Sequence, residues 1–259
     1  MDNDVLGIRM MDFSWERSAV LRIFWIGWTL ALGVNPGASA EESVDIEKFR
    51  ASSEQWEDAV RELEARDRAE AHPEDSILFV GSSSVRMWPD ISKDMAPYHP
   101  VQRGYGGASL ADLVFFTERI VYPHAFRALV LFLGNDIIGG ENDRTPDEVA
   151  GLFVRVLDLV RARHPDTPVF YVAVTPTRAR WAAWPAIRNG NRKVQSVCEA
   201  RPHTYFIATE SVYLDAENEP REGLFLEDAL HQNQAGYDRW AAVIKSHLDT
   251  VLGGANLGR

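Results

Sequence analysis

The chain has 259 residues, of which 46% are apolar and 25% charged, and it contains a single cysteine. This composition is typical of a globular protein, and one cysteine excludes an intrachain disulfide framework and cysteine-based zinc or iron–sulfur sites. The formal net charge of −11 argues against a nucleic-acid-binding protein, because neutralising phosphates requires clustered Lys and Arg.

The first forty residues have the pattern of a secretory signal peptide. A nearly unbroken apolar run covers residues 23–34, follows Arg17 and Arg22, and precedes Ala38-Ser39-Ala40. The run is about twelve residues long, whereas a helix that spans a bilayer needs roughly 20. A basic flank, a short apolar segment and a small-x-small site predict cleavage after Ala40. An uncleaved N-terminal membrane anchor is the alternative.

The signal peptide, residues 1–40, also predicts where the protein resides. Its cleavage implies export to the periplasm or out of the cell, and it leaves no stable membrane span in the mature chain. Because acidic residues are unusual at the start of such a segment, Met10 or Met11 is an alternative start of translation. Cys198 would be unpaired in an oxidising compartment and is expected to be a buried small hydrophobe.

Residues 41–75 are expected to form an N-terminal helical extension. The stretch 42–71 is rich in charged, helix-favouring residues, and its apolar side chains recur at helical spacing. These side chains are Ile46, Phe49, Trp56, Val60 and Leu63. The pattern predicts one long amphipathic helix that packs on the rest of the chain and stops at His72-Pro73.

Strand and helix patterns then alternate through residues 76–259. Strands are expected over 77–80, 100–103, 128–133, 168–174 and 205–208, and helices over 109–120, 145–163, 186–200 and 234–252. Ser109 is a candidate N-cap, and Thr145 opens a capping box with Pro at the first helical position. The alternation predicts one α/β domain with a parallel sheet covered on both faces.

Chemically useful side chains follow these strands. They are in Gly81-Ser82-Ser83-Ser84, in Gly104-Tyr105-Gly106-Gly107, in Gly134-Asn135-Asp136 and, near the C-terminus, in Asp228-Ala229-Leu230-His231. Sites in open parallel sheets form at the carboxyl ends of the strands, so the four groups are expected to meet there. Taken singly, each has a plainer alternative: a turn, a phosphate-binding loop or a surface Asp–His pair.

Together these residue types suit nucleophilic catalysis. A serine between a strand and a helix exposes its hydroxyl, and a histidine can accept its proton. Asp228 lies three residues before His231 and can fix the imidazole tautomer. An oxyanion needs donors, for which the Ser83 N–H, the Gly107 N–H and the Asn135 amide are candidates.

These motifs resemble those of the SGNH subgroup of GDSL esterases and lipases. The first block is similar to residues 79–84, the second to 104–107, the third to Asn135-Asp136, and the last to residues 228–237. The resemblance extends over roughly residues 76–252. It implies a flavodoxin-like, three-layer α/β/α sandwich with about five parallel strands, and hydrolysis of esters without a metal or cofactor.

The resemblance also implies roles for individual residues. Ser83 would be the nucleophile, His231 the base and Asp228 its orienting acid, while Gly107 and Asn135 would complete the oxyanion hole with the Ser83 N–H. Ser82 and Ser84 are the alternative nucleophiles. Ser82 stands where many members have Asp, and the third block reads Leu133-Gly134-Asn135-Asp136 rather than Gly-x-Asn-Asp.

The sequence therefore predicts an exported serine esterase for short acyl or O-acetyl groups, including those on carbohydrates. A lysophospholipase or thioesterase-like acylhydrolase, and a catalytically silent glycan-binding module of the same fold, are the alternatives. An ester is the only partner expected, with no nucleic acid and no prediction for the oligomeric state. The aromatic-rich stretch 177–185 either lines the substrate pocket or packs beneath the following helix.

Overall fold

The computed structural model describes residues 44–253. The signal peptide predicted over residues 1–40, its cleavage after Ala40 and the alternative starts at Met10 and Met11 lie outside the described residues. Within 44–253, no helix is both long enough and apolar enough to cross a membrane.

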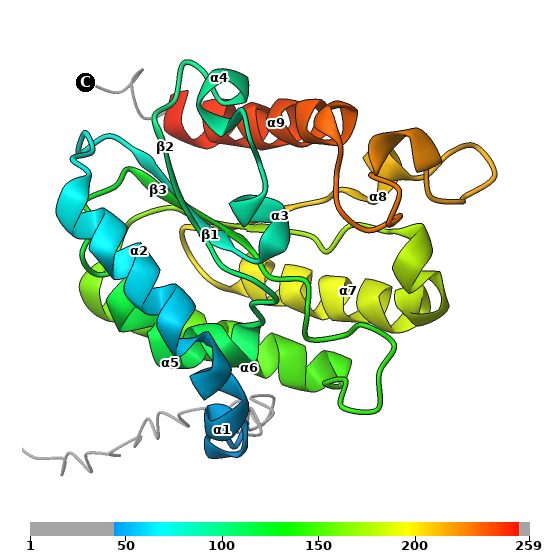
Figure 1. Cartoon of the computed structure of the whole chain (residues 1–259), viewed down its shortest axis with the longest axis horizontal. Coiled ribbons are helices and arrows are strands. Elements are labelled where there is room, and N and C mark those ends of the chain that lie inside the picture. The colour runs from blue at the N-terminus through cyan, green and yellow to red at the C-terminus, as the bar shows by residue number, and fades with distance from the viewer. Residues whose placement is uncertain (1–43, 254–259) are drawn as a thin grey trace, which may run out of the picture. The chain divides into compact units, whose positions relative to one another are not determined.

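Five parallel strands form a single sheet in the order β2-β1-β3-β4-β5 (Figure 1). They are β1 (Ile77–Gly81), β2 (Pro100–Gly104), β3 (Ala128–Phe132), β4 (Val169–Val172) and β5 (Thr204–Ile207). The central pair is in register from Ile77 opposite Ala128 to Gly81 opposite Phe132. This strand order is the flavodoxin-like one, in which the direction of winding reverses between β1 and β3.

Helices cover both faces of the sheet (Figure 1). One face carries α2 (Glu57–Ala69), α5 (Leu110–Ile120), α6 (Pro146–Arg163) and α7 (Trp184–Ala200). The other carries α3 (Ser83–Arg86), α4 (Ile91–Asp94), α8 (Glu210–Tyr213) and α9 (Gln234–Leu248). The predicted three-layer α/β/α fold is confirmed.

Side chains of the central strands alternate between two hydrophobic cores. In β1, Leu78 and Val80 belong to the core under α5 and α6, whereas Ile77 and Phe79 belong to the core under α9. Both faces of each central strand are buried, which explains why β1 and β3 appear in the sequence as continuous apolar runs. Cys198 is buried in the first core, as expected of a small hydrophobe.

The prediction of one unbroken helix over residues 42–71 is wrong in part. The described portion divides into η1 (Glu47–Phe49), α1 (Arg50–Ser53), η2 (Glu54–Trp56) and α2. The hydroxyls of Ser52 and Ser53 both donate to the Phe49 carbonyl, a type of side-chain bond that competes with the helical ladder and bends helices. The segment is helical at the predicted spacing, but these local bonds interrupt the regular α-helix.

Arginines fix α2 to the rest of the fold. Arg103 of β2 is fully buried, and its guanidinium donates to Asp67 (2.6 Å) in the helix and to Glu70 (3.0 Å), the residue directly after it. At the other end of α2, Arg119 of α5 binds Glu57 and Glu64. The charged side chains that mark this stretch as helical therefore also position it over the edge strand.

Some element ends differ from the prediction. The last helix leaves regular α geometry at Leu248 and continues as a π-helical turn, η5 (Asp249–Gly253). Helix α7 begins at Trp184 because Pro185 occupies an early position where its missing N–H costs nothing. The capping boxes at Ser109 and Thr145 are both present.

Candidate active site

The predicted site residues lie at the carboxyl edge of the sheet, where β1 and β3 end side by side. The chain leaves β1 toward β2 on one side and later returns to β3 on the other. This reversal opens a crevice between the two connecting loops. Ser83 follows the end of β1 by two residues, and Asn135 lies in the loop after β3.

Ser83 is the first residue of α3 and follows an extended Ser82. The end of β1 approaches the end of β3 so closely that a Cβ on Gly81 would overlap the Phe132 carbonyl oxygen. Glycine is therefore required there, and the Ser82 N–H donates to the same oxygen. Ser82 and Ser84 are buried, whereas Ser83 is half-buried and faces the crevice.

Three of the predicted residues form one hydrogen-bonded chain. The Ser83 hydroxyl lies 2.9 Å from His231 Nε2, and His231 Nδ1 lies 2.6 Å from Asp228 Oδ2. An ionised Asp228 favours the tautomer in which Nδ1–H donates to it, which leaves Nε2 free to accept the serine proton. Ser83, rather than Ser82 or Ser84, is the serine that the structure joins to His231.

A tight turn holds Asp228 and His231 together. Asp228 Oδ1 accepts the N–H groups of Leu230 (3.0 Å) and His231 (2.9 Å), while Ala229 between them adopts a positive φ of 54°. Burial tends to raise the pKa of the Asp228 carboxyl, but the hydrogen bonds from His231 and Leu230 outweigh burial and lower the pKa below its ordinary value. The carboxylate therefore remains ionised over the pH range of most esterase assays.

Two of the three candidate oxyanion donors, Ser83 and Asn135, line the same pocket, whereas Gly107 is not part of its lining. Among the described residues, the N–H groups of Ser83 and Gly107 have no acceptor, so both are available to a ligand. Trp56 of the N-terminal extension lies against the second motif: a Cβ on Gly106 would overlap its indole, and one on Gly107 would lie 3.3 Å from it. Because Gly106 and Gly107 have no Cβ, the indole of Trp56 can pack directly against this loop.

Asn135 has two partners that the sequence did not reveal. Its Nδ2 donates to the Ala108 carbonyl (2.9 Å), and its Oδ1 accepts from Arg180 Nη2 (2.7 Å). Arg180 belongs to η3 (Arg178–Ala183), the segment between β4 and α7. Arg180 lies within the aromatic-rich stretch 177–185, but nothing in the local sequence pattern indicates a role for it.

Asp136, the residue after Asn135, connects the loop after β3 to the start of α5 through hydrogen bonds. It is buried and accepts the N–H groups of Leu110 (2.8 Å) and Ala111 (3.4 Å) at the start of α5. Burial raises the pKa of its carboxyl to about 6, although these N–H groups and Arg144 act in the opposite direction. Asp136 thus ties the third motif to the helix that follows the second.

The pocket beside Ser83 is small, and its walls are partly polar and partly apolar. Its volume is about 30 Å³, and its lining includes Thr175, Thr177, Arg180, Phe225 and His231. The tryptophans of the stretch 177–185 are not in the lining; Trp181 and Trp184 stack on each other with ring centroids 6.1 Å apart and pack against the core. Of the two interpretations of this stretch, the structure supports packing for the tryptophans.

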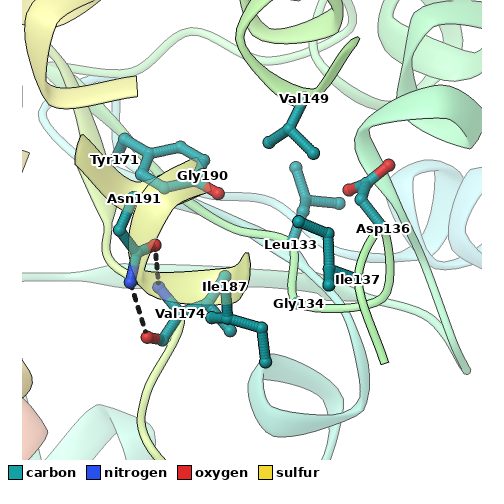
Figure 2. Close-up of a pocket in the computed structure, with 10 residues that line it drawn as sticks. All are labelled: Leu133, Gly134, Asp136, Ile137, Val149, Tyr171, Val174, Ile187, Gly190 and Asn191. Carbon is teal, nitrogen blue, oxygen red and sulfur yellow. Dashed lines mark hydrogen bonds between the residues drawn. The ribbon is translucent and has the colours of Figure 1, made fainter. Parts of the chain in front are cut away.

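A second cavity lies behind Gly134 and has mostly apolar walls (Figure 2). It is lined by Leu133, Gly134, Asp136, Ile137, Val149, Tyr171, Val174, Ile187, Gly190 and Asn191. The Asn191 amide closes one side by bonding both the N–H and the carbonyl of Val174 (Figure 2). With about 10 Å³, it has room for roughly one water molecule, so it does not extend the pocket for a long acyl chain.

A larger depression lies on the other side of Phe225. Its volume is about 220 Å³, and it is lined by Arg178, Pro220, Glu222, Phe225, Leu226, Glu227 and Ala229. Phe225 borders both this depression and the pocket of Ser83. Within residues 44–253, no group of three or more His, Cys, Asp or Glu side chains is arranged to hold a metal ion.

The sequence pattern of the GDSL-like Lipase/Acylhydrolase family matches residues 75–239. The chain belongs to this family. The predicted family and enzyme class, a GDSL-type carboxylic ester hydrolase, are therefore confirmed. The match begins after α2, so the helical extension that carries Trp56 lies outside the GDSL pattern.

Solved structures with low sequence identity share the GDSL fold. A protein from Streptococcus pneumonia, whose description names platelet activating factor, aligns with a TM-score of 0.66 at 19% identity, over 78% of this chain and 98% of its own. A GDSL-like lipase from Bacteroides thetaiotaomicron gives 0.62 at 19% identity, over 74% and 97%. A carbohydrate esterase of family 3 from Talaromyces cellulolyticus gives 0.53 at 17% identity, over 70% and 99%. Curated proteins yielded no match.

Proposed function

We propose that this protein is an exported serine esterase that removes short acyl groups, acetyl above all, from hydroxylated compounds such as carbohydrates. The observation that carries the proposal is the hydrogen-bonded chain from Asp228 through His231 to Ser83, whose backbone N–H has no acceptor within residues 44–253. A nucleophile, a base, an orienting acid and oxyanion donors are the parts that acyl transfer requires.

The first half of the reaction forms an acyl-enzyme. Ser83 Oγ attacks the ester carbonyl carbon while His231 Nε2 accepts its proton, and Asp228 stabilises the imidazolium. The carbonyl electron pair moves onto oxygen, where the N–H groups of Ser83 and Gly107 and the Asn135 amide receive the negative charge. The tetrahedral intermediate then breaks the bond to the alcohol, which leaves with the proton from His231.

The second half releases the acid. A water molecule gives a proton to His231 and attacks the acyl carbon, and the same donors stabilise a second oxyanion. When this intermediate breaks down, the bond to Ser83 is cleaved and His231 returns the proton to Oγ. The carboxylic acid leaves, and the enzyme returns to its starting state.

The size of the pocket supports a short acyl group. A volume of about 30 Å³ accommodates roughly two water-sized groups, enough for an acetyl but not for an alkyl chain. The depression of about 220 Å³ beyond Phe225 offers room for the alcohol portion, and its charged side chains, Arg178, Glu222 and Glu227, suit a polar group. The related fold of a carbohydrate esterase is consistent with a sugar there.

The proposal is tested by substrate profiling of the mature protein. We expect the highest kcat/KM on p-nitrophenyl acetate, a lower value on butyrate and little turnover of octanoate, together with release of acetate from acetylated xylan. A fluorophosphonate probe should label Ser83. Faster turnover of long acyl chains would overturn the acetyl preference, and absence of labelling would favour the silent glycan-binding alternative.

Export is tested separately. N-terminal sequencing of the protein from a fractionated host should find a chain that begins at Glu41 in the exported fraction. Full-length protein retained in the membrane fraction would support an uncleaved anchor and contradict the proposed cleavage.

A further inference from the structure

Arg180 forms two hydrogen bonds to the loop that contains the third motif, Gly134-Asn135-Asp136. Its guanidinium donates through Nη1 to the Gly134 carbonyl and through Nη2 to Asn135 Oδ1 (2.7 Å). Both acceptors are neutral, and among the described residues no carboxylate forms an ion pair with Arg180. Burial lowers the pKa of the Arg180 guanidinium, and the nearby Asp143 carboxylate offsets this effect only in part, so holding the charge beside the crevice is costly.

The two contacts of Asn135 determine which way its amide faces. Arg180 can only donate and the Ala108 carbonyl can only accept, so Oδ1 must face the guanidinium and Nδ2 must face Ala108. If the amide were rotated by half a turn, its NH₂ group would face the Arg180 guanidinium and its oxygen would face the Ala108 carbonyl, and neither pair can form a hydrogen bond. One N–H of Nδ2 is used by Ala108, and the second is left for a ligand in the pocket.

The backbone around Arg180 is fixed from the other side of the site. The Ala179 N–H donates to the carbonyl of Ala229 (3.2 Å), the residue of positive φ between Asp228 and His231. The same short segment therefore touches the turn that carries the base and, through the Arg180 side chain, the loop that carries the amide donor.

We propose that Arg180 is a positioning residue of the oxyanion hole, which orients the Asn135 amide toward the oxyanion; this inference rests on the proposed function. The contribution should fall on kcat, because the oxyanion is absent from the bound ester.

The test is a double-mutant cycle on p-nitrophenyl acetate with Arg180→Met, Asn135→Ala and the double variant. Loss of one oxyanion donor costs about 10²–10³ in kcat, so we expect roughly 10²-fold for Asn135→Ala and about 10- to 100-fold for Arg180→Met, with KM nearly unchanged. The double variant should be no worse than Asn135→Ala by more than about threefold, because Arg180 acts through the amide. Arg180→Lys, which can reach one acceptor but not form the fork, should recover part of the loss.

Arg188→Met is the matched control, since Arg188 lies on the adjacent α7 and, among residues 44–253, pairs only with Glu210 at the surface. It should leave kcat unchanged. Rates are expressed per fluorophosphonate-labelled site, so partial misfolding of a variant does not count as lost catalysis. If Arg180→Met fails to fold, the comparison of Arg180→Lys with Arg180→Gln in both Asn135 backgrounds replaces it.

Two outcomes overturn the positioning role while the proposed function stands. One is an unchanged kcat in Arg180→Met when Asn135→Ala is impaired; the other is an equal loss on Arg180→Met whether or not Asn135 is present. If Ser83→Ala and Asn135→Ala both keep full activity, the proposed function itself fails, and the result is distinct from either of these.

Discussion

The two halves of the candidate site are held in different ways. Ser83, His231 and Asp228 hold one another, and Asp228 and His231 belong to a single turn. Gly107 and Asn135 depend instead on residues outside the motifs, namely Trp56 behind the glycine loop and Arg180 beside the amide. The half proposed to supply the nucleophile and base (the nucleophile–base half) is therefore self-contained, whereas the half proposed to bind the oxyanion (the oxyanion half) relies on support from distant parts of the chain.

The largest effect should come from the self-contained half. Ser83→Ala removes the attacking atom and should lower kcat by roughly 10⁴- to 10⁶-fold without loss of stability. The measurement is hydrolysis of p-nitrophenyl acetate alongside thermal unfolding. Ser82→Ala and Ser84→Ala remove hydroxyls that make no hydrogen bond among the described residues and should lose at most about tenfold. A larger loss in either variant would assign the nucleophile elsewhere.

Asp228→Asn should rank next, at about 10²- to 10⁴-fold in kcat. The asparagine oxygen can still accept the N–H groups of Leu230 and His231, so the turn survives. Its NH₂ group, however, would face His231 Nδ1 and favour the tautomer that cannot accept the serine proton. Pre-steady-state acylation rates measure this step directly, and an unimpaired acylation rate would contradict an orienting role for Asp228.

Trp56→Ala tests whether the oxyanion half needs its external support. Loss of the indole behind Gly106 and Gly107 should lower kcat by about 3- to 10-fold, because a small displacement of a donor is enough to weaken transition-state binding. Phe49→Ala is the control, since Phe49 lies in the same extension but packs near Lys48 and Arg144 instead of the loop. Equal losses of kcat in the two variants would indicate a general effect of the extension.

The smallest effect concerns stability in relation to pH. Asp136 has a pKa raised to about 6 in the folded protein, above the value of about 3.9 for an unfolded chain. Between these values the folded state binds more protons, so the free energy of unfolding should fall as the pH rises from about 4 to about 6. Asp136→Asn should remove this part of the slope, on the order of 1–3 kcal/mol.

Denaturant unfolding at a series of pH values measures that slope. Glu141→Gln is the control because Glu141 is an exposed acid in the same loop. An identical pH dependence in Asp136→Asn and the unmodified protein would contradict the raised pKa. The kcat of Asp136→Asn on p-nitrophenyl acetate should change little. That result would show that Asp136 stabilises the fold around the oxyanion half without acting as an oxyanion donor.

Much of the fold was predictable because its signals are local. The apolar runs of β1 and β3 and the capping boxes at Ser109 and Thr145 depend on residues within a few positions of one another. The break at Ser52 and Ser53 was not predicted, because helical spacing alone does not reveal a hydroxyl that bonds the preceding turn.

The sequence by itself determined the family, and it predicted the Ser83, His231 and Asp228 that the structure joins by hydrogen bonds. The Asp-x-x-His spacing places Asp228 and His231 in one turn. A serine between a strand and a helix, such as Ser83, has few possible side-chain orientations. Only the tertiary structure brought Arg180 to Asn135 and Trp56 to Gly106, across long stretches of chain. Such contacts depend on which strands are neighbours in the sheet. The residues next to an arginine or a tryptophan in the sequence do not indicate which distant residues its side chain will contact.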